Sequence, residues 1–273
     1  MSLPTTRVAI IGGGLSGLYA AYLLEQQGIQ DYVLLEARPM LGGRIQSVAP
    51  DIPPSGAAQR ERFDLGPSWY WPAFQQQMDR LLDELGLTRL EQFDAGDMLI
   101  ERSASGPLMR SPGYQTSPPS VRLQGGMAAL VEALRERLDP ARIITGQRVN
   151  RLRRMDASVE VESFDSFGRS TCWRAEQVLL ALPPRLAESS IAFTPALPPN
   201  LTQQWQATAT WMAPHAKYVA IYERPFWREQ GLSGEARSMR GPLGEIHDAS
   251  IPGGRAALFG FFGMPLSLRQ TLS

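Results

Sequence analysis

Cysteine is nearly absent from this chain, because Cys172 is the only one among 273 residues. A single cysteine excludes an internal disulfide and a cysteine-rich zinc site. The apolar alternation of residues 170–182 around it predicts a small buried side chain. Histidine is scarce too, and His215 and His247 without convergent carboxylates do not form a metal site. We therefore predict no metal centre.

An excess of charge of either sign is also missing, because 27 basic residues balance 27 acidic ones. A neutral chain gives no global electrostatic reason to bind nucleic acid or an anionic membrane. We interpret the arginine-rich stretch 148–154 as one exposed strand face. No apolar run has the length that spans a bilayer, and no signal peptide opens the chain. These absences predict a cytoplasmic protein without a membrane anchor.

The N-terminal stretch has the pattern of a strand, a helix and a second strand. Residues 7–11 (RVAII) predict a parallel strand buried on both faces. Residues 15–24 repeat apolar side chains at three- and four-residue steps, and Gly28 then supplies a stop signal for that helix. Residues 32–36 (YVLLE) predict the second strand. Together they predict a βαβ unit.

Glycines at a fixed spacing join the first strand to the helix. Gly12, Gly14 and Gly17 match G-x-G-x-x-G, in which the glycines permit a tight turn, a close approach of backbone to a pyrophosphate, and close packing of helix on strand. The amides of Leu15 and Ser16 at the helix start would then face the phosphates. The alternative is a turn that is purely structural.

An acid and a second glycine pair follow. Glu36 ends the second strand at the expected distance for binding a ribose diol, and its charge argues against the 2′-phosphate of NADP. Gly42 and Gly43 favour FAD over NAD, because a plain NAD site needs no second pair. Arg44 either pairs with the FAD diphosphate or lies in a surface turn. The predicted cofactor contacts in this stretch are Glu36, Ala37, Arg38, Gly42, Gly43 and Arg44.

With these motifs in place, residues 8–47 resemble the N-terminal unit of the flavin-containing amine oxidases. That family includes monoamine, polyamine and L-amino-acid oxidases, with protoporphyrinogen oxidases and carotenoid desaturases as more distant kin. Later stretches resemble family segments in the same order, namely 63–72, 124–134, 146–154, 178–198 and 215–234. The resemblance implies that FAD is the cofactor.

The resemblance also implies further cofactor contacts. The segment with Gly66, Pro67, Ser68 and Trp69 is similar to the one that passes beside the flavin ring. Many members have two glycines where this chain has Gly66 and Pro67, and proline has no amide hydrogen to give. Val149 is similar to the valine whose backbone meets the adenine.

Lys217 is the candidate catalytic residue. It is similar to the family's flavin-site lysine, which binds a water that bridges to flavin N5. In the apolar run KYVAIY a charge is costly without a partner. The alternative is a lysine at a strand edge that keeps its amine in solvent.

The expected fold class is α/β, with a Rossmann-like, doubly wound FAD-binding domain and an interleaved α+β substrate domain. We expect residues 1–75 and 122–185 in the first domain and residues 76–121 and 186–273 in the second. In the family a further segment usually follows the point where this sequence stops. We therefore expect the substrate domain to be incomplete at its C-terminus.

The resemblance implies an FAD-dependent oxidoreductase that oxidises an amine by hydride transfer to flavin N5. The acceptor would be O2, and the products an imine and hydrogen peroxide. Two alternatives stay open: an FAD-dependent desaturase or porphyrinogen-oxidase-like enzyme, and a non-catalytic protein with an FAD fold. The expected partners are a small amine and O2, without nucleic acid or membrane, and a homodimer is left open.

Overall fold

The computed structural model describes residues 3–50, 61–103, 106–210, 212 and 214–271. The chain divides into two compact units, and each unit is formed by two separate stretches of sequence. The first unit is Met1–Arg44 with Val131–Trp211, and the second is Ile45–Leu130 with Met212–Ser273.

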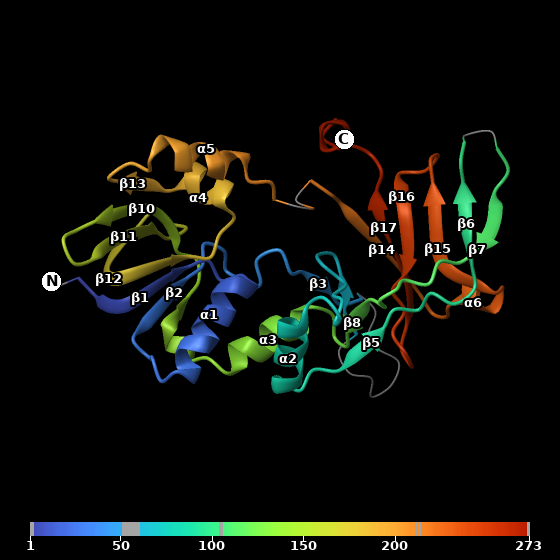
Figure 1. The fold of residues 1–273 in the computed structure, drawn as a ribbon, viewed down its shortest axis with the longest axis horizontal. Coiled ribbons are helices and arrows are strands. Elements are labelled where there is room, and N and C mark those ends of the chain that lie inside the picture. The colour runs from blue at the N-terminus through green and yellow to red at the C-terminus, as the bar shows by residue number, and fades with distance from the viewer. Residues whose placement is uncertain (1–2, 51–60, 104–105, 211, 213, 272–273) are drawn as a thin grey trace. The chain divides into compact units, whose positions relative to one another are not determined.

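The first unit is built on a seven-stranded sheet with the order β13-β10-β11-β12-β1-β2-β9. β1 pairs in parallel with β2 on one side and β12 on the other, while β10, β11 and β12 form an antiparallel meander (Figure 1). The strands are β1 (Thr5–Ile11), β2 (Tyr32–Leu35), β9 (Ile143–Ile144), β10 (Arg148–Arg154), β11 (Val159–Phe164), β12 (Ser170–Leu180) and β13 (Ala192–Thr194). The helical segments are α1 (Leu15–Gln26), α4 (Pro184–Ser190), α5 (Pro199–Ala207) and the 3₁₀ turn η1 (Pro140–Arg142).

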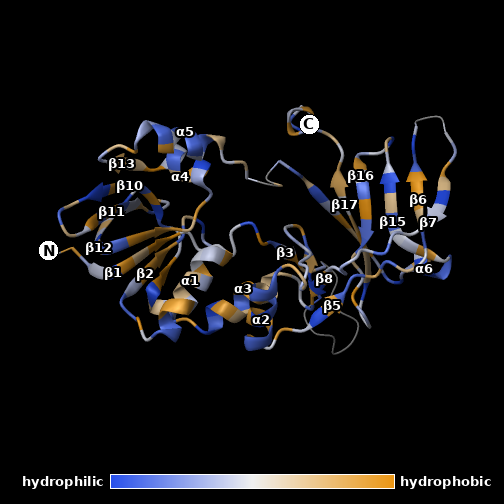
Figure 2. Cartoon of the chain, in the orientation of Figure 1, coloured by the Kyte–Doolittle hydropathy of each residue, from blue (hydrophilic) through white to orange (hydrophobic). Residues whose placement is uncertain are grey.

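Apolar residues explain the core of this sheet. All four residues of β2 are buried, as expected for a strand covered on both faces. Helix α1 buries Gly17, Leu18, Ala21 and Tyr22. Figure 2 shows β2 in hydrophobic colours over most of its length. No helix within the described ranges is both long and apolar enough to cross a membrane.

The second unit is built on a six-stranded sheet with the order β14-β17-β16-β15-β6-β7. Two small two-stranded sheets, β3-β4 and β5-β8, accompany it. The strands are β3 (Ser47–Val48), β4 (Phe63–Asp64), β5 (Arg89–Glu91), β6 (Asp97–Glu101), β7 (Met109–Pro112), β8 (Val121–Leu123), β14 (Lys217–Tyr222), β15 (Leu232–Ser238), β16 (Leu243–Asp248) and β17 (Ala256–Phe262). The helices are α2 (Gln76–Glu84), α6 (Phe226–Glu229) and α7 (Leu266–Arg269), and α3 (Ala128–Glu136) begins at the end of this unit's first stretch.

A compact aromatic core lies on one face of the six-stranded sheet. Phe63, Ala249, Ala257 and Phe259 are buried there. Trp69 and four partly buried side chains of the strands and their ends pack against them, namely Val219, Ile221, Ile251 and Phe261. The register explains this face, because Lys217 pairs with Phe261 and Val219 with Phe259 across β14 and β17. Residues two apart on a strand share a face, and so Lys217 starts on the core side.

The fold class matches the prediction, whereas the unit boundaries differ from the expected domain boundaries. Residues 45–75 and 122–130 belong to the second unit, and residues 186–211 belong to the first. Strand pairing is the reason, because β13 pairs with β10 and β3 pairs with β4 rather than with the large sheet of the first unit. A sequence pattern shows where a strand lies but not which partner it selects.

Two predictions about single side chains are wrong. Cys172 is half-buried, because Trp173 and Ala175 take the buried face of β12 and the cysteine lies opposite Glu162 on the other face. Burial still raises the pKa of the Cys172 thiol. The spacing of Phe74, Met78, Leu81 and Leu85 predicts one apolar helix face, but Phe74 precedes α2 and is 76% exposed.

Candidate functional site

The glycine turn of the first unit has no room for side chains at two of its three glycines. A Cβ on Gly17 would overlap the carbonyl oxygen of Gly12. A Cβ on Gly12 would lie 2.7 Å from the carbonyl oxygen of Ala181, and φ at Gly12 is +112°. Gly14 is the N-cap of α1 and leaves the helix start bare, since it has no side chain to cap the amides. The turn therefore has the close packing and the open helix end that the spacing predicts.

The second glycine pair packs directly on the first turn. The amide of Gly42 donates to the carbonyl oxygen of Gly13 over 2.8 Å, and Gly14 forms an isolated parallel bridge with Gly42. A Cβ on Gly43 would lie 3.0 Å from the Cα of Gly14. Two backbone turns thus meet without intervening side chains. Such a surface of bare amides suits a diphosphate.

Glu36 lies behind the glycine turn and is only 6% exposed. Its Oε2 accepts a hydrogen bond from the amide of Gly13 over 2.7 Å, and its Oε1 accepts one from the amide of Arg38 over 2.9 Å. Oε1 also accepts from the Nε of Arg38 over 3.4 Å, and Oε2 retains a further lone pair that can accept from a ribose hydroxyl. The first unit therefore fits FAD at the residues that the motif selects. Sequence reasoning missed Gly13, whose amide fixes the acid, because the motif constrains only its neighbours.

The other predicted cofactor contacts of the first unit lie on more open backbone or in strand β10. Arg44 lies in an exposed turn. Val149 is buried beside a register shift between β10 and β11. Leu15 is half-buried, whereas three further residues are exposed, namely Ser16, Ala37 and Arg38. Their contacts with a cofactor stay predictions.

Lys217 turns its amine into the second unit. The Nζ donates to the carbonyl oxygen of Gly66 over 3.1 Å and to the hydroxyl of Ser68. It also lies 3.9 Å from the ring centre of Phe259, within range of a cation–π contact. Although β14 is the edge strand of its sheet, the amine does not extend away from the protein. Burial lowers the pKa of Lys217 to about 8.

The 66–69 segment is therefore brought to the predicted lysine within one unit. Pro67, where many members have glycine, is exposed, and the groups on either side of it bind Lys217. The missing amide of Pro67 leaves these contacts intact. Trp69 packs in the aromatic core, with its ring 4.8 Å from His247 and 5.0 Å from Phe259 between centres.

Asp64 is a half-buried acid that sequence reasoning missed. Its Oδ1 accepts from the hydroxyl of Ser47 over 2.5 Å and from the amide of Met127 over 2.8 Å. The amide of Ala128 donates to the same Ser47 hydroxyl over 3.1 Å, so the two side chains satisfy the start of α3. Burial raises the pKa of the Asp64 carboxyl. A carboxylate in the run FDLGPSW carries no spacing signal that sets it apart.

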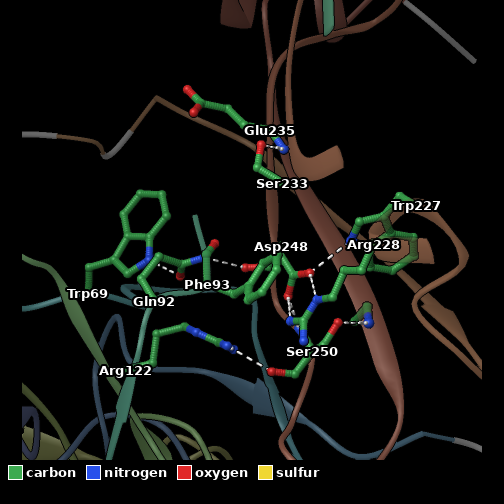
Figure 3. Close-up of polar contacts among 11 residues, drawn as sticks. Trp69, Gln92, Phe93, Arg122, Trp227, Arg228, Ser233, Glu235, Asp248 and Ser250 are labelled. Carbon is green, nitrogen blue, oxygen red and sulfur yellow. Dashed lines mark hydrogen bonds and ion pairs between the residues drawn. The ribbon is translucent and has the colours of Figure 1, made fainter. Parts of the chain in front are cut away.

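Asp248 is a fully buried acid at the centre of a group of polar contacts (Figure 3). Arg228 pairs with both of its oxygens over 2.8 and 2.9 Å, and the indole nitrogen of Trp227 donates over 2.8 Å. Gln92 joins this cluster to the aromatic core, because it accepts from Trp69 and donates to the carbonyl of Asp248 (Figure 3).

Arg122 lies between these two acids in the interior. Its Nη2 donates to the carbonyl oxygen of Ser250 over 2.8 Å, as Figure 3 shows, and only 7% of the residue is exposed. Burial lowers the pKa of Arg122. On one side it lines a cavity of about 270 Å³ with Phe93, Asp94 and Arg228. On the other it lines a cavity of about 10 Å³ with Asp64 and Ser68.

The composition holds one signal that points to this site without any motif. Of the 27 basic residues, 26 are arginine, and Lys217 is the single lysine of the chain. Lysine can lose its proton when it is buried, whereas arginine does not. Because the other 26 basic residues are all arginine, Lys217 is the one basic side chain of the chain that can lose its proton.

Family profiles match most of the chain. Residues 10–85 match an NAD(P)-binding Rossmann-like domain. Residues 90–252 match the flavin-containing amine oxidoreductases, and this second match alone spans more than half of the chain.

Relatives agree with these matches over shorter stretches. A probable flavin-containing monoamine oxidase A of Dictyostelium discoideum is 34% identical over 90 residues, which are 33% of this chain and 19% of that protein. A putrescine oxidase of Kocuria rosea is 36% identical over 109 residues, which are 36% of this chain and 22% of that protein. The matched stretches thus span about a fifth of the length of these relatives.

The fold is shared with solved structures. A redesigned triple mutant of a putrescine oxidase superposes with a TM-score of 0.82 at 21% identity, over 100% of this chain and 78% of that one. At this identity the likeness establishes the fold.

Proposed function

The chain belongs to the flavin-containing amine oxidoreductases, and on this premise we propose that it binds FAD and takes part in the oxidation of an amine. FAD fits the first unit, where two glycine turns meet without side chains and Glu36 lies behind them. Gly12, Gly14 and the start of α1 would hold the diphosphate, with Arg44 as a further cation. Glu36 would accept the ribose hydroxyls.

The bound flavin would supply the hydride acceptor, and the residues of this chain would position the substrate and exclude water from it. Lys217 would hold a water molecule through its amine, which Gly66 and Ser68 fix in direction. With a pKa of about 8, this amine changes charge near neutral pH, as a group that holds and moves a proton requires. We rest the amine oxidase assignment on this contact.

The substrate would be a small amine, the class in the names of the matched relatives. It would lose its α-hydrogen together with the electron pair, and a proton from its nitrogen, and so become an imine, which water hydrolyses. O2 would take up the two electrons with two protons and leave as hydrogen peroxide.

The test is the visible spectrum of the purified chain after incubation with FAD. Flavin bands that survive gel filtration, and that bleach under a panel of amines without oxygen, are the expected result. Peroxide release on admission of air tests the acceptor. A protein that retains no flavin overturns the proposal, and a yellow protein that no amine bleaches reduces it to a non-catalytic FAD fold.

A further inference from the structure

The small cavity beside Ser68 connects three polar groups in the interior of the second unit. It measures about 10 Å³ and is lined by Asp64, Ser68 and Arg122 among apolar side chains such as Leu90 and Phe259. That volume is close to the space that one water molecule needs. Ser68 is also the hydroxyl that binds the amine of Lys217. The cavity thus lies one hydrogen bond away from the lysine.

The hydrogen-bonding capacity of these groups fits one bridging water. The Nε of Arg122 is buried and has no hydrogen-bond partner among the described residues. The Oδ1 of Asp64 already accepts two hydrogen bonds, which leaves Oδ2 for another donor. The Ser68 oxygen accepts from the ammonium of Lys217, so its own hydrogen is available for donation. The three groups offer two donors and an acceptor, and a buried water makes about three hydrogen bonds.

We propose that Asp64 is a positioning residue for Lys217. Through one water in this cavity and through Ser68, its carboxylate holds the lysine amine in place and favours the charged form of that amine. The inference rests on the proposed function, in which Lys217 acts at the flavin.

The charges around Lys217 determine in which direction its pKa shifts. Burial is the largest influence on the pKa of Lys217 and lowers it, Asp64 raises it, and Arg122 lowers it. The ring of Phe259 also favours the charged amine. Without Asp64 the lysine would lose a stabilising charge while the burial and the arginine stayed. Its proton would then leave at a lower pH.

Other ionisable groups near this core lie farther along it. His247 contacts the same Phe259 ring and binds Glu245 over 2.7 Å, and Arg62 lines the far wall of the cavity. The largest charged contributions to the pKa of Lys217 come from Asp64 and Arg122. These two residues therefore carry the test.

The single lysine makes the experiment selective. Protein grown with ¹³C-labelled lysine has one labelled side chain, and the shift of its ε-carbon with pH gives the titration midpoint of Lys217. In Asp64→Asn we expect the midpoint to fall by roughly 1 pH unit, because an opposite charge is removed. The asparagine oxygen can still accept from Ser47 and Met127, so the start of α3 keeps its partners.

The direction of the shift excludes a trivial cause. A variant that merely loosens the interior would admit water and move the midpoint up, toward that of an ordinary lysine. A midpoint that rises or stays in place in Asp64→Asn overturns the proposal. Arg122→Gln removes a like charge and should move it up. Asp97→Asn, an acid on β6 that pairs with Arg110, is the matched control and should leave it unchanged.

The link through Ser68 has its own test, which also stands if Asp64→Asn does not fold. Ser68→Ala removes one of the two acceptors of the charged amine, and we expect the midpoint to fall there too. In the double variant the midpoint should fall by less than the sum of the two single-variant shifts, because both residues act along one path. An unchanged midpoint in Ser68→Ala contradicts the path.

The outcomes separate this proposal from the proposed function. The titration uses no substrate, and its failure leaves flavin binding and bleaching by amines as they are. If both hold, the pH profile of bleaching should shift down with Asp64→Asn by the amount that the lysine signal shows. A profile that stays fixed while the lysine midpoint moves would leave Asp64 without influence on the reaction.

Discussion

The candidate site of the first unit and that of the second unit differ in the groups that form them. In the first unit the glycine turns are backbone, and only Glu36 adds a side chain behind them. In the second unit Lys217 is held by groups that lie about 150 residues away in sequence. The first kind of site depends on the room left where side chains are missing. The second depends on polar side chains kept in the interior, each of which must find partners. Disturbing the two kinds of site should therefore have different effects.

The largest effect should come from Asp248, the buried acid of the second unit. Asp248→Ala leaves Arg228 and Trp227 without their acceptor, and we expect the free energy of unfolding to fall by about 3–5 kcal/mol. Urea denaturation measures it. Glu229→Ala breaks an exposed pair with Arg224 and should cost less than about 1 kcal/mol. Equal losses in the two variants would mean that burial does not set the difference.

A smaller loss is expected in the glycine turn. Gly17→Ala forces a Cβ against the carbonyl of Gly12, and we expect a loss of about 2–3 kcal/mol together with weaker flavin retention. Gly28→Ala is the control, because it has a positive φ of +73° but open space around its Cβ. It should cost about 1 kcal/mol and spare flavin retention. If Gly28→Ala releases flavin as readily as Gly17→Ala, the close packing is not what holds the turn.

The pH dependence of stability should reveal the buried amine. Because the folded pKa of Lys217, about 8, lies below that of an unfolded lysine, the unfolded chain binds more protons between these values. The free energy of unfolding should therefore rise with pH above about 8, by about 2 kcal/mol by pH 10.5. Lys217→Met should lack this rise. Denaturation at several pH values gives the free energy of unfolding of both proteins. If the amine were solvated, the difference between the two free energies would not change with pH.

The smallest effect concerns the acid of the first unit. Glu36→Gln replaces a charged acceptor of two amides, those of Gly13 and Arg38, by a carboxamide with one acceptor oxygen, so one of the two amides loses its partner. We expect roughly a tenfold weaker affinity for FAD, since one hydrogen bond to a charged group is worth about 1.5 kcal/mol. Quenching of flavin fluorescence measures the affinity. Glu188→Gln, on α4, should bind FAD as tightly as the parent protein does. An equal loss of affinity in that variant would mean that the net charge of the protein, and not the place of Glu36, sets the effect.

The sequence predicts the backbone site of the first unit far better than the side-chain site of the second unit. Fixed spacing reveals Gly12, Gly14 and Gly17, because their conformations follow from local geometry. Asp64 and Arg122 approach Ser68 only through the fold, and no local pattern distinguishes them from other polar residues. Lys217 was found through family resemblance, although its uniqueness in the composition pointed to it independently.

The fold shows the same limit. The alternation of residues 159–182 predicts two strands joined at Gly168, and the structure has β11 and β12 on either side of that glycine, which has a positive φ. Residues 186–211, expected in the second domain, cluster with the first unit, where β13 pairs with β10, which comes much earlier in the chain. Side-chain exposure at Phe74 was also misjudged, since α2 begins two residues later and leaves that ring outside the helix.

Because the chain has one lysine, proteolysis at that residue can measure how often β14 detaches from its sheet. A protease that cuts only after lysine can divide the chain at a single bond, between Lys217 and Tyr218, into fragments 1–217 and 218–273. That bond is the first of a paired strand whose leading amine points inward. Digestion of the native protein therefore has to wait until the strand detaches, and its rate counts those events directly.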